Sequence, residues 1–476
     1  MFDGTAKYLK GIPKRRLQIA FLVIAAGVLF PLIFAAYILS THGSFDNVFD
    51  YEPVLRLFEA FVLAGVLVFV AAAADLFLKM RSRSKSLFPS SFTWALAVIS
   101  IILAVSVASY VLLPGLIRSG DVPPQLLLTA ANQSNVPGIA VAFYTEKPTA
   151  NALRWGSANG TQWILREDKP SNKHWFQLNN LQPGQQYAYS LNGNNSVEFR
   201  TPSADGLHFA ASGDPHFGAE ASRNDLTRLM LKDIANPANS YSMFFLLGDA
   251  VQFGFFDALW KQAFNSMATA SSSIPTAYVL GNHDAMFGGV EFYKDYLCPP
   301  GLSSVQGQCL TKRIDNGNVH FLILDVEWQL QTYTPEQKQW LQQQLASIPK
   351  SDWCIVMSHT FYYSSGSFVD GWAWYDNQAT ISELTPLFEN SSVDLVLSGH
   401  KHHSEVLQKN NITYVVLGAF GGPPDAERQY VSPASIWYAQ GKYAFADVTI
   451  HGDNATLVIR DPGYAELFKT EIQNRK

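Results

Sequence analysis

Residues 278–287 read YVLGNHDAMF, and this stretch decides the fold. An apolar run typical of a buried strand stops at Gly281, and Asn282, His283 and Asp284 follow without a gap. A core strand normally ends in residues that make a turn. Because an amide, an imidazole and a carboxylate are all costly to bury, this strand end is predicted to bind a ligand.

The same pattern recurs after residue 206, where apolar runs end in SGDPH, LLGD, VMSH and LSGHKH. Helix candidates lie between these runs, the clearest at TPEQKQWLQQQLASI with Thr334 as N-cap. Strands that alternate with helices predict a layered α/β domain, and the carboxyl ends of its strands face one crevice. A lone histidine at a strand end is more often structural, but five such ends in this order favour a metal site. The side chains expected to meet there are Asp214, His216, Asp249, Asn282, His359, His400 and His402.

Residues 119–204 have a different sequence pattern. Short stretches of alternating apolar and polar residues, such as GIAVAFYT and QQYAYSLN, lie between Asn, Gly and Pro turns. This spacing predicts an antiparallel β-sandwich. LQPGQQYAYSL followed by FRTP resembles the end of a fibronectin type III repeat, a fold that mostly serves as a spacer or docking module.

The set of D-x-H, GD, GNHD, a single His and GH-x-H resembles the calcineurin-like metallophosphoesterase family, from about Gly206 to Asp461. The resemblance implies a four-layer α-β-β-α domain over residues 205–476. It also implies hydrolysis of phosphate mono- or diesters by a metal-activated hydroxide. One metal would be held by Asp214, His216, Asp249 and His402, and the other by Asp249, Asn282, His359 and His400. His283 would then face the substrate phosphate as the catalytic acid, and Asp284 would orient it.

A sandwich followed by this domain is similar to the purple acid phosphatase branch of that family. Two positions depart from the branch: His216 stands where it has Gly, and Gln252 where it has a Tyr ligand. Without a phenolate ligand, the resemblance implies two divalent ions, Mn²⁺, Fe²⁺ or Zn²⁺, rather than a ferric ion.

Three apolar runs near the N-terminus, at about 17–39, 54–78 and 92–113, each reach the roughly 20 residues that cross a bilayer. They predict a membrane domain over residues 1–118. Lys and Arg before the first run and between the second and third predict a cytoplasmic N-terminus and an extracytoplasmic catalytic domain. The protein would thus be an integral membrane protein with the lipid bilayer as a partner. Residues after 119 carry 23 basic against 33 acidic residues, which argues against a nucleic acid polymer as partner.

The segment FYYSSGSFVDGWAWYDNQ between His359 and His400 is dense in aromatic residues. It could form a wall that stacks on a nucleobase or sugar or dips toward lipid, or it could pack on the sandwich. The candidates for substrate binding are Phe361, Tyr362, Tyr363, Trp372 and Trp374. Lys401, between two of the histidines, is expected to be a solvated spacer.

Cys298 and Cys309 bracket a Pro/Gly-rich loop and could form a disulfide, whereas Cys354 is expected to be a buried apolar residue. Two alternatives to a general phosphoesterase stay open at this point. One is the same chemistry on a lipid-linked phosphate or phospholipid headgroup. The other is a non-catalytic receptor or adhesion module, against which the intact set of ligating residues and His283 argue.

Overall fold

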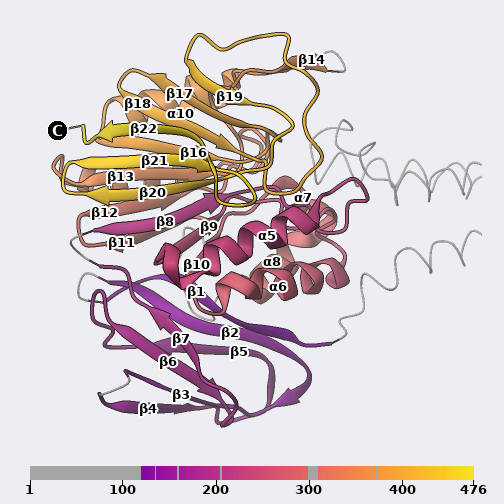
Figure 1. Cartoon of the computed structure of the whole chain (residues 1–476), viewed down its shortest axis with the longest axis vertical. Coiled ribbons are helices and arrows are strands. Elements are labelled where there is room, and N and C mark those ends of the chain that lie inside the picture. The colour runs from indigo at the N-terminus through magenta and orange to yellow at the C-terminus, as the bar shows by residue number, and fades with distance from the viewer. Residues whose placement is uncertain are drawn as a thin grey trace, which may run out of the picture. The chain divides into compact units, whose positions relative to one another are not determined.

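The computed structural model describes residues 120–133, 136–157, 160–203, 206–298, 309–369 and 372–475. The chain separates into two compact units, Met1–Ile117 and Arg118–Lys476, and the described residues all belong to the second. Two large sheets form the centre of this second unit (Figure 1).

The first sheet has nine strands in the order β22-β21-β20-β8-β9-β10-β1-β2-β5. Its strands β8, β9 and β10 run parallel, and β20 pairs with β8 in the antiparallel direction. The strand bounds are β1 Val122–Gln133, β2 Val136–Thr149, β5 Ser171–Leu178, β8 Leu207–Ser212, β9 Met243–Leu246, β10 Thr276–Tyr278, β20 Phe445–His451, β21 Asn454–Arg460 and β22 Glu466–Gln473.

The second sheet has seven strands in the order β11-β12-β13-β16-β18-β17-β19. Four of its five inner strands, β12, β13, β16 and β18, are parallel. The strand bounds are β11 Lys312–Asn316, β12 Val319–Ile323, β13 Trp353–Ser358, β16 Val393–Ser398, β17 Ser404–Lys409, β18 Ile412–Leu417 and β19 Ser435–Ala439.

Two smaller sheets and the helices complete the described residues. A four-stranded sheet has the order β4-β3-β6-β7, and β14 pairs with β15 in a short hairpin. Their bounds are β3 Ala152–Gly156, β4 Gln162–Arg166, β6 Gln186–Leu191, β7 Val197–Arg200, β14 Ser367–Val369 and β15 Trp372–Trp374. The helices are α5 Asn224–Ala235, α6 Asp257–Ser271, α7 Asn282–Ala285, α8 Gly289–Leu297, α9 Pro335–Ser347 and α10 Gln378–Glu389, with 3-10 turns η1 Pro237–Asn239 and η2 Met286–Gly288.

The side-chain alternation of strands produces the layers. In β9, Phe244 and Leu246 pack with the helices α5 and α6, whereas Met243 and Phe245 face the second sheet. Between the sheets, the ring of Phe321 lies 4.7 Å from that of Phe245. Helices α9 and α10 cover the outer face of the second sheet. The described residues therefore have the α-β-β-α order of a phosphoesterase-like fold.

Helix α9 begins where the sequence predicts, directly after the N-cap residue Thr334. Thr334 precedes the helix, and its hydroxyl oxygen accepts a hydrogen bond from the backbone N–H of Gln337 at 3.2 Å. The side chain of Gln337 in turn accepts from the backbone N–H of Thr334 at 2.7 Å. This capping box satisfies two donors that the helix leaves unpaired.

Strands β1 to β7 occupy the part of the chain where the sequence predicts a sandwich. Its strands β1, β2 and β5 continue the nine-stranded sheet, because β1 pairs with β10 in parallel at Leu127 and Thr276. Trp155 and Tyr187 of the four-stranded sheet belong to the same buried apolar cluster as Phe209 and Phe321. The segment before residue 205 is thus joined to the α/β layers through both a sheet and a core.

The predicted fold class and location are corrected in one respect. Among the described residues, no helix is long and apolar enough to cross a membrane. The longest of them, α6, has 15 residues and spans about 22 Å, less than the roughly 30 Å of a bilayer core. The three predicted spans, 17–39, 54–78 and 92–113, lie outside the described residues. The three transmembrane helices, the bilayer as partner and the integral-membrane location are therefore not carried further.

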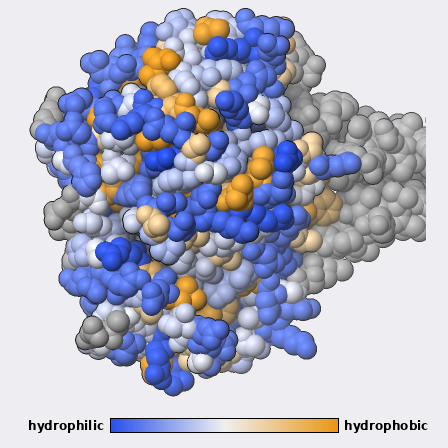
Figure 2. All heavy atoms as spheres, viewed as in Figure 1, coloured by the Kyte–Doolittle hydropathy of each residue, from blue (hydrophilic) through white to orange (hydrophobic). Residues whose placement is uncertain are grey.

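The face of the protein in Figure 2 is mostly hydrophilic, with apolar side chains scattered among polar ones. The large apolar side chains with the greatest exposure among the described residues are Ile164, Leu229, Phe368, Trp372, Val431 and Ile436. Two of them, Phe368 and Trp372, belong to the β14–β15 hairpin.

Candidate metal centre

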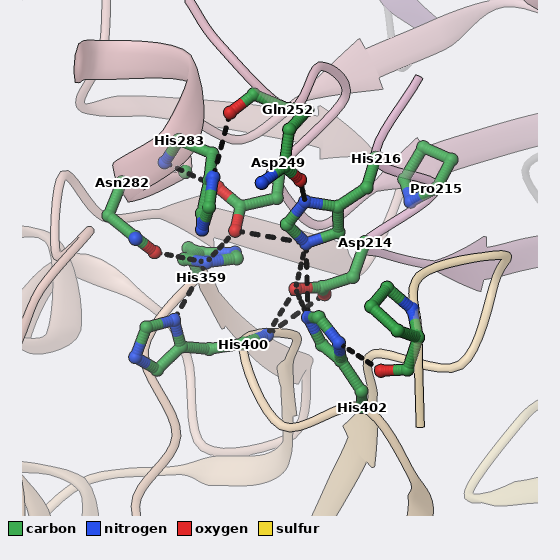
Figure 3. A network of polar contacts seen from close by, with 12 residues as sticks. Asp214, Pro215, His216, Asp249, Gln252, Asn282, His283, His359, His400 and His402 are labelled. Atoms are coloured by element: carbon green, nitrogen blue, oxygen red, sulfur yellow. Dashed lines mark hydrogen bonds and ion pairs between the residues drawn. The ribbon is translucent and has the colours of Figure 1, made fainter. Parts of the chain in front are cut away.

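Five strands from both large sheets end at one place. The loop after β8 carries Asp214 and His216, and the loop after β9 carries Asp249. Asn282 and His283 open α7, directly after β10 and Gly281. The loops after β13 and β16 bring His359, His400 and His402 from the second sheet to the same point (Figure 3).

Asp214, His216 and His402 form the first group of potential ligands, with one ligand atom of each residue within 4.8 Å of the others. The Nε2 of His402 lies 3.4 Å from a carboxylate oxygen of Asp214. The Nε2 of His216 lies 3.7 Å from the same oxygen and 3.0 Å from the Nε2 of His402.

Asp249, His359 and His400 form the second group, again with ligand atoms within 4.8 Å of one another. The Nε2 of His359 lies 3.2 Å from Oδ2 of Asp249, and 3.0 Å from both the side-chain oxygen of Asn282 and Nδ1 of His400. The same Oδ2 of Asp249 lies 3.4 Å from the Nε2 of His216 in the first group. One oxygen of Asp249 therefore lies between the two groups.

The hydrogen bonds of the histidines fix which nitrogen faces the centre. The Nδ1–H of His402 donates to the carbonyl of Pro423 at 2.6 Å, and that of His359 to the carbonyl of Leu247 at 2.7 Å. The Nδ1–H of His216 donates to the side-chain oxygen of Gln252 at 2.7 Å. In the neutral rings, each Nε2 then presents a lone pair to the centre, a pattern typical of metal-binding histidines.

Lone pairs that face each other need a cation between them. The Nε2 atoms of His216 and His402 are only 3.0 Å apart, and neither can donate a proton to the other when both rings are neutral. The surroundings are dry, since Asp214, Asp249 and His359 are almost completely buried. A nitrogen and oxygen donor set of this kind fits divalent Mn, Fe or Zn.

The charges in this centre attract cations. Burial alone would raise the pKa of Asp249, yet the facing imidazoles, His359 first, hold it well below its usual range. Burial alone would lower the pKa of His359, but Asp249 and Asp214 outweigh that and raise it to about 10. A metal ion bound at Nε2 would displace the proton that the ring holds there. Both carboxylates are therefore ionised, and their negative charge is available to a bound metal.

The backbone of the ligand loops is strained. Four ligand residues, Asp214, His216, Asp249 and His400, have φ between 45° and 70°, the left-handed region that costs a non-glycine residue about 1–3 kcal/mol. At Gly281 a Cβ would collide with the carboxylate and the backbone nitrogen of Asp249. Strain and close approach concentrated at one site indicate a functional constraint rather than a packing requirement.

His283 and Asp284 have different surroundings from those that the sequence predicts. The Nδ1–H of His283 donates to the backbone carbonyl of Gln252 at 2.8 Å, and its backbone N–H donates to Asp249 at 2.8 Å. Asp284 accepts the backbone N–H groups of Val251 and Gly281, each at 3.1 Å. Asp284 thus ties together the loops that follow β9 and β10, and the carbonyl of Gln252 holds the ring of His283.

Burial also shifts the pKa of both groups. It lowers the pKa of His283 to about 4, against the pull of Asp249. It raises the pKa of Asp284 to about 8, and the nearby charge of Asp249 adds to the effect. The two backbone N–H groups that its carboxyl oxygens accept suit a role of Asp284 as a structural tie between the two loops.

Gln252 is a residue whose role the sequence did not reveal. Its side chain holds the ring of His216, and its backbone carbonyl holds the ring of His283. The two departures from the purple acid phosphatase pattern, His216 and Gln252, are therefore hydrogen-bonded to each other. The signal in the sequence was the pair of departures themselves, 36 residues apart.

We expect Gln252→Ala to weaken Mn²⁺ binding about 10- to 100-fold, because the ring of His216 loses its orienting acceptor. The backbone carbonyl that holds His283 stays in this variant, so kcat at saturating Mn²⁺ should remain near that of the wild type. A titration of activity against Mn²⁺ checks both points. An unchanged midpoint would show that Gln252 does not orient His216.

Lys401 is not a solvated spacer, and that prediction is wrong. Its side chain is 1% exposed, and its ammonium lies 3.0 Å from a carboxylate oxygen of Asp425 and donates to the carbonyl of Trp374 at 3.0 Å. His403, also buried, lies 3.0 Å from Asp425 on one side and 3.3 Å from Glu405 on the other. A buried ion-pair network thus fixes the loop that bears His400 and His402.

We expect Asp425→Asn to lower the free energy of unfolding by about 3–5 kcal/mol, because Lys401 would keep a buried charge without its partner. Urea denaturation measures the loss. The matched control is Glu383→Gln, which removes the exposed ion pair with Lys338 and should cost under about 1 kcal/mol. Equal effects of the two substitutions would contradict the structural role of Asp425.

The aromatic candidates for substrate binding divide into two sets. Tyr362 is 1% exposed, with its hydroxyl 3.2 Å from Ser358, and Tyr363 packs edge-on against Tyr414. Both belong to the core beside α9 and α10. Phe361 is also buried but stacks against the ring of His400, with centroids 6.0 Å apart.

Trp374 lies beside the candidate metal centre. Its ring is half-buried, with its centroid 5.0 Å from that of His400. Trp328, which the sequence did not single out, lies edge-on at 4.9 Å from the same ring and 5.7 Å from Trp374. Trp328 comes from the segment after β12, which carries none of the predicted ligand residues, so only the tertiary structure reveals it.

Cys298 and Cys309 are joined by a disulfide in the structure, with Cα atoms 5.6 Å apart. The bridge closes the segment between α8 and β11. Cys354 is buried in β13 with a free thiol.

Comparison with known proteins agrees with this geometry. Residues 207–404 match the calcineurin-like phosphoesterase family. Two uncharacterised proteins of Mycobacterium tuberculosis are 29% identical over 164 residues, a match that covers 31% of this chain and 30% of each relative. Purple acid phosphatase 18 of Arabidopsis thaliana is 20% identical over 424 residues, covering 83% of this chain and 87% of the relative.

Among solved structures, a purple acid phosphatase from yellow lupin seeds superposes with a TM-score of 0.61 at 17% identity, over 74% of each chain. At that identity the likeness shows the fold. The family match and the fold both agree with the predicted phosphoesterase domain.

Proposed function

Because residues 207–404 form a calcineurin-like metallophosphoesterase domain, we propose that the protein hydrolyses phosphate mono- or diesters with two divalent metal ions. The observation that carries the proposal is the position of Asp249, whose Oδ2 lies 3.4 Å from His216 and 3.2 Å from His359. A carboxylate oxygen between two groups of ligands suits a bridge between two ions.

The residues that would hold the ions follow from the two groups. One ion would be held by Asp214, His216, Asp249 and His402, and the other by Asp249, Asn282, His359 and His400. Bound there, the ions would supply a water of lowered pKa and charge that stabilises the phosphoryl oxygens. Gln252 in place of a Tyr ligand favours Mn²⁺, Fe²⁺ or Zn²⁺ over a ferric ion.

The chain itself contributes the proton donor. The carbonyl of Gln252 fixes Nδ1 of His283 as protonated, so Nε2 is the nitrogen that can exchange a proton with a substrate. A phosphate ester adds negative charge to the centre, which raises the pKa of a nearby imidazole. His283 would then protonate the oxygen of the departing alcohol. Asp284 serves this step indirectly by tying the two loops beside His283.

The experiment is hydrolysis of p-nitrophenyl phosphate and bis-(p-nitrophenyl) phosphate by the purified full chain with added Mn²⁺. The expected result is turnover of at least one ester that stops on chelation and returns with Mn²⁺. A protein that binds two ions per chain but cleaves no ester in a broad panel of mono- and diesters would instead support the non-catalytic receptor. The complete set of ligating residues and the placement of His283 favour the enzyme.

A further inference from the structure

We propose that Trp328, Trp374 and Trp372 form a stacking strip that binds a planar aromatic group of the substrate, so that nucleotides are preferred over phosphate esters without a base. This inference rests on the proposed phosphoesterase function and names the substrate class of the same site. It starts from the two tryptophans next to His400, a residue of the metal centre.

Trp328 and Trp374 lie at the edge of the centre rather than in the core. Both are half-buried, and their rings contact the ring of His400 at 4.9 and 5.0 Å. Their own centroids are 5.7 Å apart with an interplanar angle of 32°, so the two rings pack against each other beside His400. A substrate whose phosphate lies at the centre would bring its organic group near this surface.

Trp374 is held in place before any substrate binds. Lys401 donates a hydrogen bond to its carbonyl at 3.0 Å, and the ammonium also lies 5.0 Å from the centroid of the indole ring. Asp425 neutralises Lys401 at 3.0 Å. The Trp374 ring is therefore held in a fixed position, and Lys401 beside it carries no unpaired charge. Fixed aromatic groups lose little entropy on binding, which strengthens stacking.

Trp372 extends the strip outward along the β14–β15 hairpin. Trp372 and Trp374 are two residues apart in one strand, so their side chains leave the same face of the hairpin. Phe368 pairs with Ala373 and therefore leaves the opposite face. Trp372 and Phe368 are each 60% exposed, so they differ in the face of the hairpin that they leave but not in exposure. Phe368 is therefore a matched control for Trp372.

The chemistry of the strip favours a nucleobase. Indole rings stack on any flat base, and removal of such a ring costs about 1–3 kcal/mol of binding per base, or about 5- to 150-fold. Adenosine 5′-monophosphate and ribose 5-phosphate have the same 5′-oxygen as leaving group and differ in the base. A comparison of the two substrates therefore isolates stacking from chemistry.

The test measures kcat and KM for both substrates with Mn²⁺ in the wild type and in Trp374→Ala, Trp372→Ala and Phe368→Ala. The wild type should have a kcat/KM at least about 5-fold higher for the nucleotide. Trp374→Ala and Trp372→Ala should remove that preference by raising KM for the nucleotide at least about 5-fold more than KM for ribose 5-phosphate. Phe368→Ala should leave the preference intact.

The outcomes separate the two proposals. If the wild type cleaves neither compound nor any nitrophenyl ester, the phosphoesterase function fails. If it cleaves both equally well, the function stands and the stacking strip is refuted. A preference for a long alkyl phosphate equal to that for the nucleotide would show a general apolar surface and also refute stacking. If Trp374→Ala does not fold, the exposed Trp372→Ala still decides the result.

Discussion

Replacement of Asp249 by Asn should remove phosphoesterase activity and both metal ions together. The change replaces the carboxylate oxygen that lies between His216 and His359 by a neutral amide of nearly the same size. If Asp249 bridges two ions, the variant removes one negative charge from the ligand set of each ion. A bound metal is worth several kcal/mol of transition-state stabilisation, so kcat/KM should fall at least about 1,000-fold.

Metal content by mass spectrometry and kcat/KM on the same sample test this expectation. Asp447→Asn is the matched control, because Asp447 is also a buried carboxylate beside a histidine, 2.7 Å from His208, and lies outside the centre. The control should keep two ions per chain and near wild-type activity per folded molecule. An Asp249→Asn protein that keeps both ions would mean that the carboxylate does not bridge.

The second large effect is expected for His283→Ala. A ring nitrogen of His283 lies within 4.8 Å of ligand atoms of His216 and Asp249, but the proposal assigns it to neither ion. Metal content should therefore stay near two per chain while kcat falls about 100- to 10,000-fold. The reason is the loss of the proton donor to the departing oxygen, since the neighbouring carbonyl of Gln252 cannot replace it. Steady-state kinetics at saturating Mn²⁺ measure the change.

The dependence on leaving group distinguishes proton donation from a general disturbance. Alkyl esters have poor leaving groups that need a proton, whereas p-nitrophenolate leaves without one. The loss in His283→Ala should therefore be larger for an alkyl phosphate than for p-nitrophenyl phosphate. An equal loss on both esters, or a loss of metal ions, would assign His283 a different role.

The positions of the candidate ligand residues could be predicted from the sequence because parallel strands impose them. Asp214, Asp249 and Asn282 follow apolar strands, and such strands end at the same edge of a sheet. Two sheets contribute to the centre, and the histidines of the second, His359 and His400, follow the same rule. The distances in the structure bring all of these side chains together.

Orientation and burial were beyond the reach of the sequence. Lys401 has the residue type of a solvated spacer, and its burial is made possible by Asp425, 24 positions away, and by the carbonyl of Trp374. Trp328 meets Trp374 through a tertiary contact between two loops. Asp284 follows His283 directly, but its carboxyl accepts the backbone N–H groups of Val251 and Gly281. The ring of His283 is held instead by the carbonyl of Gln252.

The prediction of three transmembrane helices rested on the apolar runs of the first 113 residues. Each run contains about 20 mostly apolar residues, which is the length that crosses a bilayer as a helix. The described structure contains no helix of that kind, and its longest helix is amphipathic, with buried residues such as Trp260 and Phe264 packed on a sheet.

The most direct test of the dinuclear centre is anomalous diffraction at the manganese absorption edge, from crystals of the full chain grown with Mn²⁺. We predict two peaks about 3.5–4 Å apart, one beside Asp214 and His402 and the other beside Asn282 and His400, with Asp249 in contact with both. A single peak, or two peaks that do not share Asp249, would contradict the account.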